Sequence, residues 1–383
     1  MTNRIYLDNA ATTCLAEPVR EAMMPWLTAQ YGNPSSIHGT GREAQKAIHL
    51  ARCKAAEAIG AEPREIFFTS GGSESDNWAL KGYAFAHRTE GNHIITSSVE
   101  HHAVLHTCRW LEKQGFRVTY LPTDAEGRVD PDTVEKAITD QTILISIMAA
   151  NNEIGTMEPV SQIGETAGNH GIAFHTDAVQ AIGAMPLNVK KLHADMLSLS
   201  AHKFHGPKGT GLLFIRSGTV LQPLIHGGAQ ERGMRAGTEN TAGIVGLGEA
   251  IALCTKDMEE KNRRIACLRD ELTEGLLRRI PDSCLNGPRR DRLPGNCHLS
   301  FRGIEGEALL LRLDMAGIAA SGGSACTSGS PEPSHVMRAI GADDERTKGS
   351  IRFTLSDETK KEELDEVLRI LPPLVEEMRR LRT

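Results

Sequence analysis

Short apolar runs alternate with longer segments of helical spacing along the first two thirds of the chain. The run 66–70 (Ile-Phe-Phe-Thr-Ser) precedes a glycine pair, and the run 142–148 is apolar and rich in β-branched residues. Alternation of such runs with helices predicts a parallel or mixed sheet covered on both faces. The predicted strands are 66–70, 92–97, 117–121, 142–148, 172–176, 196–199 and 211–216. The predicted helices between them are 75–88, 102–114, 132–138 and 160–170.

The pattern changes after residue 226. Segment 227–243 is charged and rich in glycine without periodicity, which predicts a loop. A long helix is predicted over 255–280, because apolar residues recur on one face and Pro281 ends it. Strands at 296–301 and 350–355 and helices at 306–315 and 358–371 follow. These elements predict a second, smaller α+β domain.

Composition and charge narrow the classes of protein. The 383 residues are 40% hydrophobic and 24% charged, which is enough apolar material for a folded core. The net charge of −6 disfavours binding to nucleic acid or anionic membranes by bulk electrostatics. The longest apolar run, 143–150, is too short for a membrane helix, and the first residues do not resemble a signal peptide. A cytoplasmic protein is expected.

The eight cysteines form no Cys-x-x-Cys pair and are too sparse for a disulfide framework. Most are expected to be small buried hydrophobes. Cys326 differs, because it lies among the small residues of 321–330. It is either a nucleophile on a loop that reaches a substrate or an incidental cysteine in a flexible linker.

Two segments next to predicted strands are candidates for anion and ring binding. Segment 69–75 (Thr-Ser-Gly-Gly-Ser-Glu-Ser) opens a helix and is either a phosphate cup or an ordinary helix cap. Asp177 falls at the carboxyl end of a strand, where open α/β sheets bind ligands. Its carboxylate suits a cationic ring nitrogen. Alternatively, His175 and Asp177 bind a metal or satisfy neighbouring backbone.

Two cationic residues are candidates for covalent and carboxylate chemistry. Lys203 follows an apolar strand, and burial would make its amine a nucleophile for a Schiff base; the alternative is a solvent-exposed loop lysine. His202 and His205 nearby permit a metal interpretation, but their spacing is not diagnostic. Arg352, in a strand, suits bidentate capture of a carboxylate or is simply exposed. Together, these groups indicate a pyridoxal-phosphate site for an amino acid.

Several segments, in order, resemble the motifs of the cysteine desulfurases, in the branch typified by NifS and IscS. The resemblance runs from residue 6 to about residue 372. The segments are Tyr6-Leu-Asp-Asn-Ala-Ala-Thr-Thr13, Tyr31-Gly-Asn-Pro-Ser-Ser36, Val99-Glu-His101, Asn151-Asn-Glu-Ile-Gly155, His175-Thr-Asp-Ala-Val-Gln180, Ser200-Ala-His-Lys203, Gly233-Met-Arg-Ala-Gly-Thr238 and Gly323-Ser-Ala-Cys-Thr-Ser-Gly329.

This resemblance implies an aspartate-aminotransferase-like fold. Its large domain, residues 16–254, would hold a mainly parallel seven-stranded sheet covered by helices and bind pyridoxal 5′-phosphate. The small domain, residues 1–15 and 255–383, would carry a mobile loop with Cys326. The family also implies a homodimer.

The resemblance assigns roles residue by residue. Lys203 looks like the lysine that holds the cofactor, Asp177 like the partner of its ring nitrogen, and His101 like the residue that stacks on the ring and moves protons. The other implied cofactor contacts are Gly72, Ser73, Asn152, Gln180, Ser200, His202 and, from the partner subunit, Thr238. The implied substrate contacts are Asn33, Asn152 and Arg352.

The implied reaction converts L-cysteine to L-alanine and leaves the sulfur on Cys326 as a persulfide. The sulfur would pass to an acceptor such as an iron–sulfur scaffold protein. No metal site is expected beyond transient contact of Cys326 with a cluster. The segment after Cys326 leans toward the nitrogen-fixation branch. Ser73 in place of threonine, Met148 with Ala149, and His102 depart from the commonest pattern without affecting the reaction.

Other functions remain open from the residues. A selenocysteine lyase or another class-V aminotransferase-fold enzyme would share the cofactor site. A metallohydrolase would use His175, Asp177, His202 and His205. A non-catalytic sulfur carrier would need Cys326 but not Lys203.

Overall fold

The computed structural model describes residues 4–322 and 334–382. Its strands are β1 (Ile5–Tyr6), β2 (Ile66–Thr69), β3 (His93–Ser97), β4 (Arg117–Leu121), β5 (Thr142–Ser146), β6 (Ala173–Asp177), β7 (Met196–Ser200), β8 (Gly211–Ile215), β9 (Ser283–Leu285), β10 (Asn296–Phe301), β11 (Ile318–Ala319) and β12 (Ser350–Thr354). Its α-helices are α1 (Glu17–Thr28), α2 (Gly39–Ile59), α3 (Gly72–Ala86), α4 (His102–Glu112), α5 (Pro131–Ala137), α6 (Val160–Asn169), α7 (Thr241–Thr255), α8 (Met258–Arg279), α9 (Gly306–Met315), α10 (His335–Ala339), α11 (Asp344–Lys348) and α12 (Lys361–Arg382). The 3-10 turns are η1 (Pro63–Glu65), η2 (Ala201–Lys203) and η3 (Glu231–Gly233).

The central sheet has seven strands in the order β2-β8-β7-β6-β5-β3-β4. β8 runs antiparallel to both of its neighbours, and the remaining pairs are parallel. The sheet is therefore mixed and mostly parallel, which confirms the predicted fold class. Strands β2, β3, β5, β6 and β7 point the same way, so the segments that follow them meet at one edge, where open α/β sheets bind ligands.

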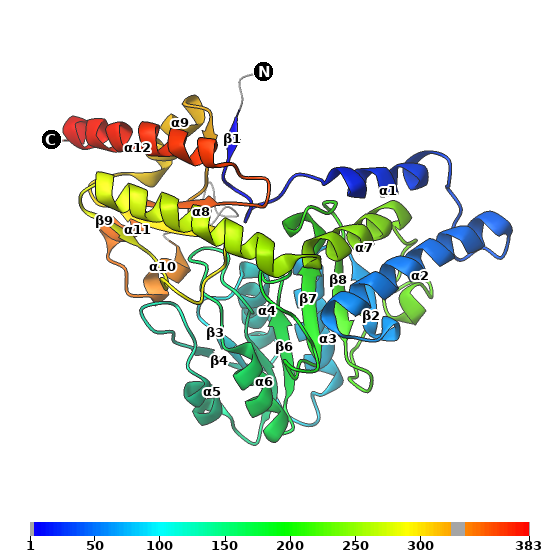
Figure 1. Cartoon of the computed structure of the whole chain (residues 1–383). Coiled ribbons are helices and arrows are strands. Elements are labelled where there is room, and N and C mark those ends of the chain that lie inside the picture. Colours follow the sequence, from blue (N-terminus) through cyan, green and yellow to red (C-terminus); the bar gives the residue numbers. More distant parts are fainter. Residues whose placement is uncertain (1–3, 323–333, 383) are drawn as a thin grey trace.

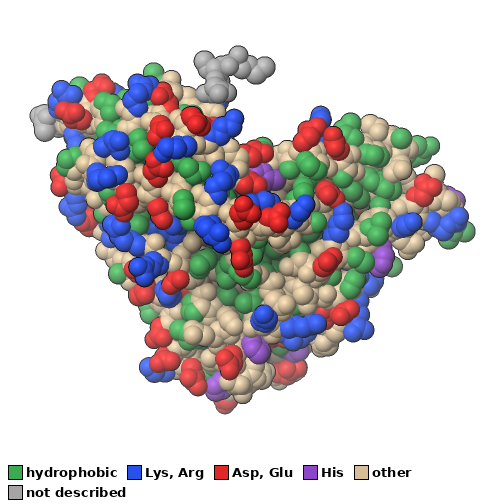
Figure 2. All heavy atoms as spheres, viewed as in Figure 1, with side chains coloured by type: hydrophobic (Ala, Val, Ile, Leu, Met, Phe, Trp, Pro, Cys, Tyr) green, Lys and Arg blue, Asp and Glu red, His purple; other side chains and the backbone are tan. Residues whose placement is uncertain are grey.

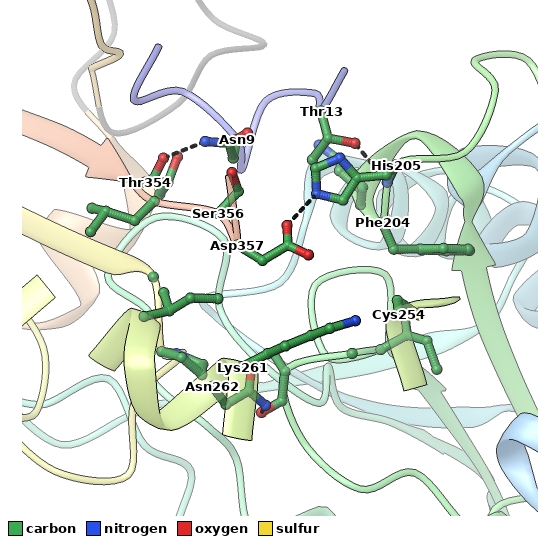
Figure 3. A pocket seen from close by; sticks show the side chains of 18 of the residues that line it. Asn9, Thr13, Phe204, His205, Cys254, Lys261, Asn262, Thr354, Ser356 and Asp357 are labelled. Carbon is green, nitrogen blue, oxygen red and sulfur yellow. Dashed lines mark hydrogen bonds and ion pairs between the residues drawn. The ribbon is translucent and has the colours of Figure 1, made fainter. Parts of the chain in front are cut away.

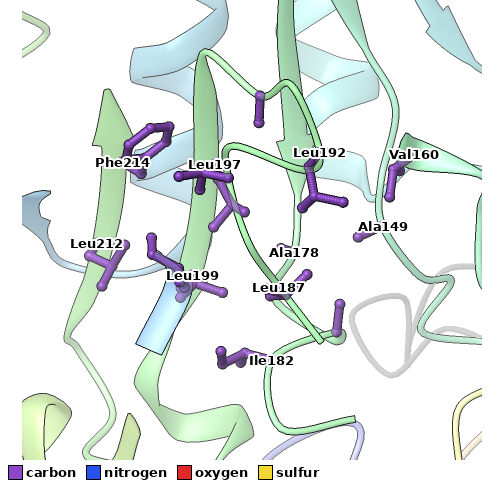
Figure 4. Packing of buried hydrophobic residues seen from close by; sticks show 14 of the residues in the cluster. Ala149, Val160, Ala178, Ile182, Leu187, Leu192, Leu197, Leu199, Leu212 and Phe214 are labelled. Carbon is purple, nitrogen blue, oxygen red and sulfur yellow. The ribbon is translucent and has the colours of Figure 1, made fainter. Parts of the chain in front are cut away.

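Alternation along the strands fills both faces of this sheet. On β2, Phe67 packs with residues of α3 and α4, whereas Ile66 and Phe68 pack on the opposite face with residues of α2, α6 and α7. Figure 1 shows these helices as separate layers around the sheet, and Figure 4 shows Leu197, Leu199 and Phe214 in the second of these cores. Both faces are covered by helices, which explains why most of the strands are rich in apolar residues.

A smaller sheet, β12-β10-β9, is antiparallel, and a two-stranded parallel sheet joins β1 to β11. Helices α8 and α12 lie side by side over it (Figure 1). The N-terminal segment belongs here, because Leu7 lies in the same apolar core and Asp8 forms a bridge with Thr354 of β12. This pairing brings residues from the two ends of the chain together beside the large sheet.

Three sequence predictions differ from the structure. Helix α7 occupies part of the predicted 227–243 loop and the residues after it, and the long helix α8 begins at Met258 rather than 255. Helix α7 contacts both α1 and α2, and apolar residues and glycines occupy most of its surface, so it shows little amphipathic period. Gly248 is required there, because a Cβ would lie 2.7 Å from Cα of Ala51 on α2. Helix α12 continues through two prolines to Arg382, beyond the predicted end at 371.

The expectation that most cysteines are buried is wrong for the part of the chain that the structure describes. Cys108 and Cys297 are buried, whereas Cys14 and Cys267 are exposed and Cys53, Cys254 and Cys284 lie in between. All seven are free thiols. No described helix is long and apolar enough to cross a membrane.

Candidate active site

A cavity of about 360 Å³ opens at the carboxyl edge of the large sheet, next to β12 of the small one. Its walls come from segments that follow β2, β3, β5, β6 and β7, together with the N-terminal segment. The predicted residues that line it are Gly72, Ser73, His101, Asn152, Asp177, Gln180, Ser200, His202, Lys203 and Arg352. The fold therefore brings ten of the predicted site residues into one space.

Lys203 ends η2, which follows the fully buried strand β7. Its Nζ donates hydrogen bonds of 2.6 and 2.8 Å to the backbone carbonyls of Ala10 and Ala11. Gln180 Nε2 donates to the same Ala10 carbonyl at 2.9 Å. Lys203 is thus a half-buried amine aimed into the cavity rather than the exposed loop lysine of the alternative interpretation.

Asp177 is buried at the carboxyl end of β6. Burial raises the pKa of its carboxyl, while the Val179 N–H, 2.9 Å from Oδ1, and the Lys203 charge oppose that rise. Asp76 of α3 is also buried, and both burial and the charge of Asp177 raise its pKa. Two carboxyl groups so close in a dry site favour a bound cation beside them.

His101 caps the N-terminus of α4, where its Nδ1 accepts a 3.1 Å hydrogen bond from the Ala103 N–H. Burial, followed by the charge of Lys203, lowers the pKa of His101 to about 4. The ring is therefore neutral near pH 7 and carries its proton on Nε2. One ring nitrogen of His101 lies within 4.8 Å of a carboxylate oxygen of Asp76 and of one of Asp177.

The N-terminus of α3 forms an open cradle. Gly71 has φ of 155° and Gly72 begins the helix; a Cβ on Gly72 would lie 2.7 Å from Cγ2 of Val179 and 3.6 Å from Cβ of Ser200. Backbone N–H groups at such a terminus bind phosphate, and the absence of side chains lets the anion approach. His202 lies nearby, with Nδ1 3.1 Å from the Thr12 hydroxyl.

Arg352 lies in the middle of β12 and is only 1% exposed. Its guanidinium donates to the Asn152 carbonyl at 2.9 Å and forms a 3.0 Å ion pair with Asp8. The exposed strand arginine of the alternative interpretation is therefore excluded. A planar cation held from two sides at a cavity wall is suited to bind a carboxylate.

Two predicted site residues lie elsewhere. Asn33 and Thr238 are exposed and do not line this cavity. Cys326 lies outside the described residues.

The prediction missed four ionisable residues that also line the cavity: Asp76, His102, Glu153 and His335. It also missed Asp8, the partner of Arg352, and the fully buried Glu100 beneath the site. Asp76 had a usable signal, since it lies one helical turn after Ser73. Glu100, His102 and Glu153 adjoin predicted site residues, so their position next to His101 or Asn152 was also a usable signal. His335 had none, because the residues beside it in the cavity are distant in sequence.

The metallohydrolase interpretation requires ligands that the fold keeps apart. Both nitrogens of His175 face serine hydroxyls, at 2.8 Å for Ser146 and 3.0 Å for Ser198. His205 faces Asp357, outside this cavity. The four proposed ligands therefore do not converge.

Comparison with protein families defines the class to which this site belongs. Residues 5–367 match the family described as aminotransferase class-V, so the chain belongs to the class-V aminotransferase family. Cysteine desulfurases of this family use pyridoxal phosphate. The cavity fits that cofactor, because it offers an amine, a buried carboxylate for a ring cation, and a glycine cradle for phosphate.

Curated relatives define the group more narrowly. The protein named cysteine desulfurase IscS of Methanosarcina thermophila is 58% identical over 377 residues, which covers 98% of this chain and 93% of that protein. The IscS of Dictyoglomus turgidum is 56% identical over 379 residues, covering 99% and 96%. The chain is therefore a cysteine desulfurase of the IscS/NifS type, as predicted.

Solved structures agree with this assignment. A structure titled NifS-like protein superimposes with a TM-score of 0.92 at 40% identity, covering 97% of this chain and 99% of that one. An apo cysteine desulfurase from Thermococcus onnurineus gives 0.88 at 28% identity, covering 98% and 95%. The curated relatives carry the name IscS rather than NifS, so they do not support the lean toward the nitrogen-fixation branch.

Proposed function

We propose that the chain uses pyridoxal phosphate to convert L-cysteine to L-alanine and transfers the sulfur to Cys326. The observation that carries this proposal is the convergence of Lys203, Asp177, His101 and Arg352 on one cavity. When bound, the cofactor supplies a carbonyl that joins amino groups and a ring that takes up negative charge. Selenocysteine is a second candidate substrate, since the same groups would bind it.

The charge state of each cavity residue would determine its role in the reaction. Lys203 would bind the cofactor carbonyl and accept the Cα proton of the substrate. Asp177 would keep a proton on the ring nitrogen, because a buried carboxylate is stabilised by an adjacent cation. His101, neutral and protonated on Nε2, would stack on the ring and donate a hydrogen bond rather than compete as a second cation.

Arg352 would hold the substrate carboxylate, with Asn152 beside it and Asn33 as a further contact. The Asp8 pair and the Asn152 carbonyl keep the guanidinium in place before substrate arrives. A fixed cation of this kind orients the amino acid, and orientation lowers the barrier to reaction.

The sulfur-transfer step would need a thiolate at Cys326. That thiolate attacks the substrate sulfur, the carbon–sulfur bond breaks, and the carbon fragment takes a proton to become alanine. The product is a persulfide on Cys326, which a sulfur-acceptor protein for iron–sulfur cluster assembly would remove.

Dimer formation would explain why Asn33 and Thr238 do not line the cavity. Apolar side chains are exposed along and between α1 and α2, including Leu27 at 61%, Tyr31 at 87% and Ile37 at 92%. Figure 2 shows hydrophobic side chains over α1 and α7, whereas both signs of charge mix over α8 and α12. Such a patch suits an interface between two copies.

Analytical ultracentrifugation should show a dimer. Ile37→Asp should weaken this dimer, whereas Met315→Asp, a change at an exposed residue of α9, should leave it intact.

The division into domains remains part of this proposal. The residues of one apolar core lie between Val19 and Ile251 with Leu293 added, whereas those of the other are Leu7 and residues from Ile265 to Val375. This separation supports a large domain of residues 16–254 and a small domain of residues 1–15 and 255–383.

One experiment tests the activity. The purified protein is mixed with L-cysteine, and its visible absorbance, alanine and sulfide are followed together. A cofactor band that shifts, with equal alanine and sulfide in the presence of a thiol reductant, is expected. Cys326→Ser should abolish sulfide without removing the cofactor band, and Cys267→Ser, at an exposed cysteine, should change neither. A colourless protein that binds no pyridoxal phosphate would refute the proposal.

A further inference from the structure

Cys14, His205 and Glu358 form a side-chain cluster next to, but outside, the cofactor cavity. Sγ of Cys14 lies 3.5 Å from Nδ1 of His205 and 3.0 Å from Oε2 of Glu358. The three potential ligand atoms all lie within 4.8 Å of one another. Cys14 and Glu358 are exposed and His205 is half-buried, so solvent reaches the cluster.

The imidazole of His205 is held from behind by a carboxylate. Its Nε2 lies 3.2 Å from Oδ1 of Asp357, the ion pair drawn in Figure 3. A neutral ring that donates from Nε2 presents the Nδ1 lone pair toward Cys14, and a protonated ring would instead donate from Nδ1 to the Cys14 carbonyl at 3.2 Å. A carboxylate on the far nitrogen is the usual support of a metal-binding histidine.

The backbone also holds His205 in a costly conformation. Its φ is 62°, in the left-handed region that residues other than glycine seldom adopt. The Thr13 hydroxyl accepts the His205 N–H at 2.8 Å and secures this turn. An uncommon conformation kept by surrounding bonds is frequent where a side chain must point in one direction.

We infer that Cys14, His205 and Glu358 bind a zinc ion, with Asp357 as a positioning residue. Tetrahedral zinc with ordinary bond lengths separates a sulfur ligand from a nitrogen ligand by about 3.5 Å, the distance that Cys14 and His205 already have. The distance between Oε2 of Glu358 and Sγ of Cys14, now 3.0 Å, would need to increase by only about half an ångström. A thiolate, an imidazole and a carboxylate suit zinc, and water completes the fourth position.

Zinc at this place would join three distant segments of the chain. Cys14 follows the N-terminal segment, His205 follows the Lys203 turn, and Glu358 precedes α12 of the small sheet's helical cover. Binding replaces the thiol proton, which passes to the buffer. Because an unfolded chain cannot hold the three ligands together, zinc binding adds to the free energy of unfolding.

The chain offers a matched control. Cys53 and His49 on α2 have a similar separation, 3.6 Å between Sγ and Nε2. Within the described ranges 4–322 and 334–382, no third ligand joins this pair. A thiol and an imidazole alone are a weak zinc site, so Cys53→Ser tests cysteine removal without removing the proposed cluster.

The test titrates zinc into the cofactor-loaded full chain against a chromophoric chelator, with iodoacetamide labelling of each cysteine read by peptide mass spectrometry. We expect wild-type protein and Cys53→Ser to bind one zinc ion per chain with equal affinity. Cys14→Ser should weaken that binding by at least about 100-fold and Asp357→Asn by about 10-fold. Zinc should also slow labelling of Cys14 at least about tenfold while Cys53 labels at its zinc-free rate.

Two results would overturn the inference. One is zinc affinity that is the same in Cys14→Ser and wild type, which would place the ion at another group such as Cys326. The other is labelling of Cys14 at the same rate with and without zinc. Glu358→Gln, a change at an exposed residue, gives an independent check, because it should weaken binding about tenfold.

Discussion

Lys203 and His205 lie two residues apart in one turn, yet their side chains enter different environments. Lys203 reaches the cofactor cavity, beside the buried carboxyl groups of Asp76 and Asp177. This more deeply buried side of the turn is called the closed side below. His205 turns to the solvent-accessible side, where Asp357 and Cys14 meet it. The contrast shows that one short turn, with its backbone held by the fold, can direct two side chains to sites with different chemistry.

Burial separates the two sides of this turn energetically. At and beneath the cavity, burial lowers the pKa of His101 to about 4 and raises that of Glu100 to about 8, so both groups favour their neutral forms. On the open side, water stabilises charge and ligands can exchange. The closed side is suited to a resident cofactor, and the open side to an ion that comes and goes.

The largest expected effect is on the closed side. Lys203→Ala should reduce alanine formation by at least about 10³-fold, because it removes the amine that binds the cofactor and moves the proton. The measurement is alanine release together with the visible cofactor band, which should also change. Lys208→Ala, at an exposed lysine in the same loop, is the control and should retain the wild-type rate. Equal loss in both variants would contradict the distinction between the two positions.

Arg352→Lys should raise the KM for L-cysteine by about 100-fold and change kcat less. A single ammonium cannot replace the planar fork that contacts Asp8 and the Asn152 carbonyl, and a charge-assisted bidentate contact is worth about 1.5–3 kcal/mol. Steady-state kinetics of alanine formation measures this. Arg346→Lys, where the guanidinium bonds Asn286 away from the cavity, serves as the control. An unchanged KM would exclude Arg352 as the carboxylate contact.

Glu100→Gln tests whether the buried carboxyl of Glu100 is protonated in the folded protein, through the pH dependence of the free energy of unfolding. Folded Glu100, with its pKa near 8, keeps a proton that the unfolded chain releases near pH 4.5. The free energy of unfolding of the wild type therefore falls as pH rises from about 4.5 to about 8, whereas glutamine does not titrate. The unfolding free energy of the variant should gain about 1.4 kcal/mol on wild type between pH 6 and pH 7. Urea unfolding at both pH values measures this, and a constant difference would show that Glu100 is ionised in the fold.

Thr13→Val tests the hydrogen bonds that link the two sides of the turn, with an effect of similar size. The Thr13 hydroxyl donates to the His202 carbonyl at 3.0 Å and accepts from the His205 N–H at 2.8 Å. Valine loses both bonds and should lower the unfolding free energy by about 1–2 kcal/mol. Urea unfolding provides the measurement, with Thr28→Val, at an exposed helical threonine, as the control. No difference between the two variants would mean that Thr13 does not secure the turn.

The seven strands of the large sheet were all predictable, because both faces of the sheet are covered and, outside the edge strand β4, nearly every strand residue is buried. Helix α7 was not, since it packs against both α1 and α2 and apolar residues and glycines occupy most of its surface, which leaves little amphipathic period. Of the site, Lys203 and Asp177 had a local signal, because Asp177 ends the buried strand β6 and Lys203 ends the short turn after the buried strand β7. Asp8 and Glu100 lie in the quoted motif segments, but no role was predicted for either, because that of Asp8 depends on pairing with Arg352 and that of Glu100 on complete burial.

The sequence by itself determined the α/β class, the order of the site motifs and the group of enzymes they resemble. These depend on residue types and on spacing along the chain. Only the tertiary structure decided that Cys14, an unremarked cysteine, meets His205 and Glu358, or that Arg352 is buried against Asp8. Contacts between residues more than 100 positions apart arise from the packing of sheets and helices, and no local pattern along the chain encodes them.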